Sequence, residues 1–159
     1  MVLYHFTPHL KIKMMRNYKK LFLMVLFAIL STTTVNAQTC SHGFDWSRLI
    51  AAMIHIESKG QNNARNGKSL GVLQITPSAV AECNNILKKK KIKKRYTLED
   101  RRDPQKSKEI FIHLQEHFNP EHSFEKATKC WNHGFYVKNI KSLPNTYYHK
   151  VMKQMTKCK

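Results

Sequence analysis

Acidic residues are scarce in this chain of 159 residues, which has ten Asp and Glu against 28 Lys and Arg. None of the ten lies before Asp45, so the start of the chain carries basic charge only. This imbalance favours an anionic partner, such as nucleic acid, an acidic membrane or an anionic polymer of a cell wall.

The sequence also lacks an apolar run of about 20 residues, the length that crosses a membrane comfortably. Its longest run, LFLMVLFAIL, covers residues 21–30, follows five basic residues and precedes Val35-Asn36-Ala37, which ends in a small residue. This order predicts a secretory signal peptide over residues 1–37, and the Met14-Met15 pair leaves a later start open. Cleavage predicts an exported protein, periplasmic or secreted, with no membrane span; an uncleaved anchor is the alternative.

Repeats, a long linker and a second domain are all missing from residues 38–159, whose length suits one domain with a real core. This part holds all ten acids and 23 of the basic residues, a net charge of about +13. Export argues against nucleic acid as the partner and favours the wall.

Zinc-type cysteine spacing is absent too, so we expect neither a metal nor a cofactor. An even number of cysteines in an exported chain predicts two disulfides, and four cysteines allow three pairings. We favour Cys83 with Cys130, and Cys40 with Cys158.

Helical periodicity and capping signals recur along residues 38–159. The expected N-caps are Asp45, Thr76, Asp103, Ser123 and Asn145. The expected inner faces are Trp46, Leu49, Ile50, Met53 and Ile54; Val80, Cys83 and Leu87; Ile110, Phe111, Leu114 and Phe118; and Tyr148, Val151, Met152 and Met155. Residues 88–95 hold seven basic residues, which form either a solvated face or a surface for an anionic polymer.

Residues 61–75 break the helical pattern, with an Asn66-Gly67 turn signal and a short apolar segment. They predict a small hairpin or looped insert. The expected fold class is therefore mainly α (α+β), with a small β insert in a helical domain.

Glu57 is the one acid between Asp45 and Glu82, and its helical position places it on the apolar face. Burial and the negative end of the helix dipole should both raise its pKa, as a general acid requires. The structural alternative is a carboxylate that reaches solvent or pairs with a cation such as Arg65.

Two residues of the following insert, Gly71 and Gln74, have properties suited to binding a ligand. Gly71 permits close approach of the backbone, and Gln74 offers an amide that can bond a sugar. Each also has a plain structural reading, a turn for Gly71 and a backbone bond for Gln74. Ser69 lies between Glu57 and this pair.

The segment ESKGQNNARNGKSLGVLQITP, residues 57–77, and the later CWNHG, residues 130–134, resemble the lysozyme-like superfamily in order and spacing. The nearest branch is that of the soluble lytic transglycosylases and goose-type lysozymes. The resemblance implies a lysozyme-like fold for residues 38–159, with Glu57 as catalytic acid. It implies substrate contacts by Ser58, Ser69, Gly71, Gln74 and Asn132. His133 departs from the family, which has a small residue there, and Trp131 is expected in the core.

The insert from Ser58 to Ala81 contains no acid, so the place for a second carboxylate is empty. A mechanism with one carboxylate fits better. The resemblance then implies a lytic transglycosylase that cleaves peptidoglycan and forms 1,6-anhydro-muramyl products. The alternatives are a hydrolytic lysozyme, in which Glu82 or Asp103 activates water, and a non-catalytic wall-binding factor of a secretion or conjugation apparatus. We expect a monomer whose partner is the glycan strand and not nucleic acid.

Overall fold

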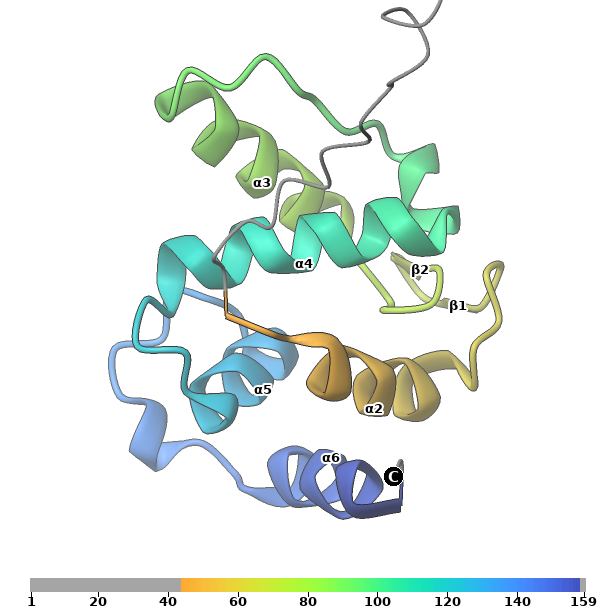
Figure 1. Ribbon diagram of the computed structural model, residues 1–159, viewed down its shortest axis with the longest axis vertical. Coiled ribbons are helices and arrows are strands. Elements are labelled where there is room, and N and C mark those ends of the chain that lie inside the picture. The colour runs from red at the N-terminus through yellow and green to blue at the C-terminus, as the bar shows by residue number, and fades with distance from the viewer. Residues whose placement is uncertain (1–43, 158–159) are drawn as a thin grey trace, which may run out of the picture. The chain divides into compact units, whose positions relative to one another are not determined.

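The computed structural model describes residues 44–157, which contain five α-helices, two short 3₁₀ helices and one two-stranded hairpin (Figure 1). The helices are α2 (Ser47–Ser58), α3 (Pro77–Lys89), α4 (Pro104–Phe118), α5 (Phe124–His133) and α6 (Thr146–Lys157). The 3₁₀ helices are η1 (Glu99–Arg102) and η2 (Ile140–Ser142). The mainly α class is confirmed.

Two expectations fall outside the described residues: the signal peptide over 1–37, and the pairing of Cys40 with Cys158. Within residues 44–157, none of the helices combines the length and the apolar character that crossing a membrane would take.

The starts of three helices follow the capping signals in the sequence. Thr76 accepts a hydrogen bond from the Ala79 amide at 3.2 Å, and Pro77 occupies the first turn of α3. Asp103 accepts from two amides at the start of α4, and Ser123 accepts from the Lys126 amide at the start of α5. These side chains satisfy amides that have no partner inside the helix, which fixes where each helix begins.

The insert is a small hairpin, as the sequence predicts. Strand β1 (Arg65–Asn66) pairs antiparallel with β2 (Ser69–Leu70), with Asn66 opposite Ser69. The turn therefore consists of Gly67 and Lys68, and Gly67 has a φ of +57°, which glycine adopts at little cost. A bridge between Leu70 and Ile75 then folds the next segment back on β2.

Helix α4 runs through the middle of the described fold, with α3 on one side of it and α2 and α5 on the other (Figure 1). Helix α6 packs against α2 and α5. The helices meet around a core of fully buried apolar side chains, including Leu49, Met53, Phe111 and Leu114. The inner faces expected for α2 to α4 are buried or packed against this core.

Helix α6 differs from the prediction by one residue. Val151 and Met155 are buried and Met152 packs against the core, as expected. The aromatic residue that joins them is Tyr147 and not Tyr148. Tyr147 is four residues before Val151 and so lies on the same helix face.

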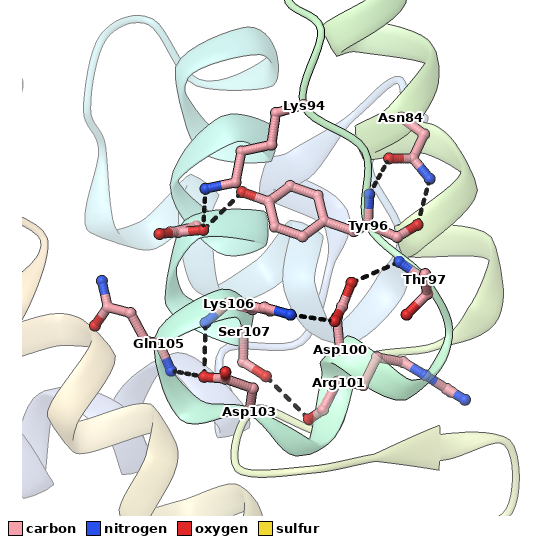
Figure 2. Close-up of polar contacts among 11 residues, drawn as sticks. Asn84, Lys94, Tyr96, Thr97, Asp100, Arg101, Asp103, Gln105, Lys106 and Ser107 are labelled. Carbon is pink, nitrogen blue, oxygen red and sulfur yellow. Dashed lines mark hydrogen bonds and ion pairs between the residues drawn. The ribbon is translucent and has the colours of Figure 1, made fainter.

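A polar network fastens η1 and the preceding loop onto α3 and α4 (Figure 2). The side chain of Asn84 exchanges two hydrogen bonds with the backbone of Tyr96, both at 2.8 Å. The Tyr96 hydroxyl donates to Glu109 of α4 at 2.9 Å, and Lys106 pairs with Asp100 at 2.6 Å. This network holds η1 in place, and η1 in turn supports the hairpin.

Candidate functional site

Glu57 lies in the last turn of α2, half-buried, with its carboxylate directed at α6. Burial raises its pKa above the ordinary value, in the direction expected from the sequence. Its partner is Tyr147, whose hydroxyl donates to Oε1 of Glu57 at 2.5 Å. Within residues 44–157 Glu57 forms no ion pair, so the alternative pairing with Arg65 is not formed.

Tyr147 is a site residue that sequence reasoning missed. Burial, and then the nearby Glu57 carboxylate, raise the pKa of Tyr147, so its hydroxyl keeps its proton and acts as donor. Its bond favours the charged form of Glu57 and opposes the effect of burial. The two residues are 90 positions apart, and the one available signal was the position of Tyr147 on the apolar face of α6.

Ser58 is buried and uses its hydroxyl within the protein. Its Oγ lies 2.9 Å from the carbonyl oxygen of Val72 and 3.2 Å from that of Ile54, and it accepts from the Gly60 amide at 3.1 Å. Ser58 thus ties the end of α2 to residues 71–75. These contacts occupy the hydroxyl of Ser58. Because Ser58 directly follows Glu57, they also help to fix the position of Glu57.

Gly71 has a φ of +83°, in the region that favours glycine. A Cβ on this residue would lie 1.7 Å from the carbonyl oxygen of Arg101. The backbone of η1 therefore lies against Gly71, in the space that the sequence analysis assigned to a ligand. Arg101 itself is buried and donates to the carbonyl oxygens of Lys68 and Ile75 at 3.1 and 3.2 Å, which fixes the hairpin from the same side.

Gln74 is held rigidly at the edge of a pocket. It has a φ of +49°, and its Nε2 donates to the carbonyl oxygens of Ala64 and Gly71, both at 2.9 Å. These bonds fix the amide with the nitrogen inward, so its Oε1 is left to accept a bond from a ligand. Ser69 is half-buried on β2 and does not line this pocket.

The pocket has a volume of about 390 Å³ and lies between the first half of α3 and the end of α5. Asn132 and Gln74 both line it, and Trp131 forms part of the wall. Trp131 also donates from Nε1 to the Leu73 carbonyl oxygen at 3.2 Å and packs against the core, which agrees with its expected role. Glu82, on α3, is a lining residue that the sequence did not single out for binding.

The expected site residues therefore form two groups. Glu57 and Tyr147 make one, while Gln74 and Asn132 face the pocket, whose lining does not include Glu57. Residues 71–75 connect the groups, because Ser58 bonds Val72 and Trp131 bonds Leu73. This segment sets the position of both.

The favoured disulfide between Cys83 and Cys130 is not formed, and both thiols are free and buried. The two side chains lie in different surroundings. The thiol of Cys83 is near Lys94, and that of Cys130 is near Lys126 and Glu121. Burial raises the pKa of the Cys83 thiol to about 12, so it stays protonated at neutral pH.

No cluster of three or more His, Cys, Asp or Glu side chains suited to a metal ion occurs within the described residues 44–157. Comparison with protein-family models, with curated proteins and with solved structures finds no match to this chain.

Proposed function

We propose that this protein is an exported lytic transglycosylase that cleaves the β-1,4 bond between N-acetylmuramic acid and N-acetylglucosamine in peptidoglycan. The observation that carries the proposal is the half-buried Glu57, with a raised pKa, at the end of α2 and bonded to Tyr147. The resemblance of its motifs to those of lytic transglycosylases and goose-type lysozymes supports the proposal. The proposal includes a lysozyme-like fold for the domain.

In this mechanism Glu57 first acts as an acid. Its proton passes to the glycosidic oxygen as the bond from C1 to that oxygen breaks. The N-acetyl group of the substrate stabilises the positive charge that develops at C1. The hydroxyl of Tyr147 donates to the carboxylate that this step leaves behind, and so stabilises the charged form of Glu57.

Glu57 then acts as a base. It takes the proton of the C6 hydroxyl while O6 bonds to C1, which gives a 1,6-anhydro ring and consumes no water. A single carboxylate serves both steps. Glu57 is not among the residues that line the pocket containing Glu82, which supports this scheme over one with two carboxylates flanking the bond.

The positive charge of the chain supports a wall polymer as partner. Residues 88–95 are all exposed, and Lys94 alone among them forms an ion pair within the described residues. The remaining charges of this run are available to an anionic wall.

The test is digestion of purified peptidoglycan followed by mass spectrometry of the products. The wild-type protein should release anhydro-muramyl fragments, and Glu57→Gln should reduce cleavage at least about 100-fold, as loss of general acid catalysis does. Glu116→Gln, which removes an exposed carboxylate from α4, is the matched control and should cleave normally. Circular dichroism should show both variants folded.

Other results would point to the alternatives. Reducing-end products mean a hydrolytic lysozyme, and intact glycan means a binding or assembly factor. Undiminished cleavage by Glu57→Gln would remove Glu57 from the mechanism.

A further inference from the structure

The pocket beside α3 contains no basic side chain, although the chain is rich in them. Lys, Arg and His account for 37 of the 159 residues, so eleven residues taken at random would include about two or three. None of the eleven lining residues is basic, and Glu82 is the one with a carboxylate. The one charged group in the lining is therefore negative, in a protein with a net charge of +18.

The carboxylate of Glu82 has capacity for a ligand. The hydroxyl of Tyr136 lies near it, and the proximity of this carboxylate raises the pKa of Tyr136. No ion pair of residues 44–157 involves Glu82. A carboxylate accepts about four hydrogen bonds, so Glu82 can accept those of a ligand.

Aromatic rings complete the lining. Trp131, Phe135 and Tyr136 all border the pocket. The indole of Trp131 is fixed by its bond to Leu73, and Phe135 stacks on Phe118 with ring centroids 4.9 Å apart. Fixed rings beside a carboxylate attract a cation through their negative faces.

We propose that this pocket binds a primary ammonium group on the glycan, that of a glucosamine unit without its N-acetyl group. An ammonium brings a positive charge and three donors to Glu82, whereas an N-acetyl group brings one donor and no charge. The inference rests on the proposed function, because it names which form of the wall glycan the protein selects.

The net charge of the protein gives the experiment a clear contrast. A positive chain repels a positive oligosaccharide at long range, and salt at 0.15 M screens that repulsion beyond about 8 Å. A preference for the cationic sugar therefore has to come from contacts inside the pocket.

The test measures binding of two probes, the glucosamine tetramer and the N-acetylglucosamine tetramer, to the full chain by calorimetry at 0.15 M salt. Wild type should bind the glucosamine tetramer about tenfold or more tightly than the acetylated one, the scale of a charge-assisted contact. Glu82→Gln should abolish that preference by weakening the glucosamine tetramer. Glu116→Gln should retain it.

Tyr136→Phe separates binding from structure. It removes the hydroxyl near Glu82 but leaves the carboxylate, so the preference should persist. If Tyr136→Phe and Glu82→Gln weaken both probes equally, Glu82 only holds the loop after α5 and the proposal is overturned. Equal affinities in the wild type, or no binding of either probe, also overturn it.

The Glu57→Gln variant distinguishes ligand binding in the pocket from the proposed catalysis. That variant should lose cleavage and retain the preference for the glucosamine tetramer. If the wild type cleaves the wall normally but shows no preference between the two tetramers, the pocket assignment alone is rejected.

Discussion

At the scale of single residues, Glu57 is governed by two opposing effects. Burial raises its pKa, and the hydrogen bond from Tyr147 lowers it. A carboxyl whose folded pKa is raised contributes stability below its unfolded pKa and loses that stability as the pH rises through the folded value. Glu57 thus weakens the fold at neutral pH.

Replacing Tyr147 with Phe should raise the pKa of Glu57 further, because it removes the bond that favours the charged form. A general acid stays protonated to higher pH when its pKa rises, so the alkaline limb of the pH profile for wall cleavage should move to higher pH. The unfolding free energy should fall by about 1 kcal/mol for the lost bond. Cleavage rates across the pH range check this.

The adjacent Tyr148→Phe is the control, since no described bond joins Tyr148 to Glu57. Its pH profile should match that of the wild type. An unmoved alkaline limb in Tyr147→Phe would mean that Tyr147 supports the fold without acting on the proton of Glu57.

At the scale of elements, the end of α3 combines strong positive charge with a defined backbone. The Ile92 amide donates to the Leu87 carbonyl oxygen at 2.9 Å, and the Lys91 amide to that of Lys88 at 3.0 Å. This is the Schellman pattern, which places Lys91 in the left-handed region with a φ of +57°. The lysines of the last turn, Lys88 and Lys89, also complement the negative end of the helix dipole.

Lys91→Gly should increase the unfolding free energy by about 1 kcal/mol, because glycine adopts the left-handed conformation without the cost that a Cβ imposes. Lys90→Gly removes the same charge at a residue with a φ of −77° and should lower the unfolding free energy by about 0.5–1 kcal/mol. Urea unfolding of both variants checks the prediction. Equal changes would indicate that charge, and not backbone conformation, dominates at this helix end.

At the scale of the whole molecule, the position of the site depends on contacts between segments far apart in the chain. The backbone of η1 presses against Gly71, and the network of Figure 2 holds η1 on α3 and α4. Residues 71–75 then carry Gln74 to the pocket and accept the bond from Ser58. The position of the site residues therefore depends on these contacts between η1, residues 71–75 and the end of α2.

Gly71→Ala should cost more than about 3 kcal/mol of unfolding free energy, because it adds left-handed strain of about 1–2 kcal/mol to a collision with the Arg101 carbonyl. Gly67→Ala is the matched control. Gly67 also has a positive φ, of +57°, but a Cβ there would meet nothing within 4 Å. It should cost only the strain, and thermal unfolding distinguishes the two. Similar costs would contradict the close packing of η1 on Gly71.

The sequence by itself determined the helices, the hairpin and the unusual place of Glu57. Thr76, Asp103 and Ser123 cap helices through bonds to residues two or three positions away, and such local interactions can be read from spacing. Only the tertiary structure decided which residues those elements bring together. Tyr147 meets Glu57, the Arg101 carbonyl meets Gly71, and Tyr136 lies near Glu82 in the lining of the pocket. The tertiary structure also decided that the thiols of Cys83 and Cys130 are free. Pairings between distant residues depend on how the helices cross, which no short stretch of sequence specifies.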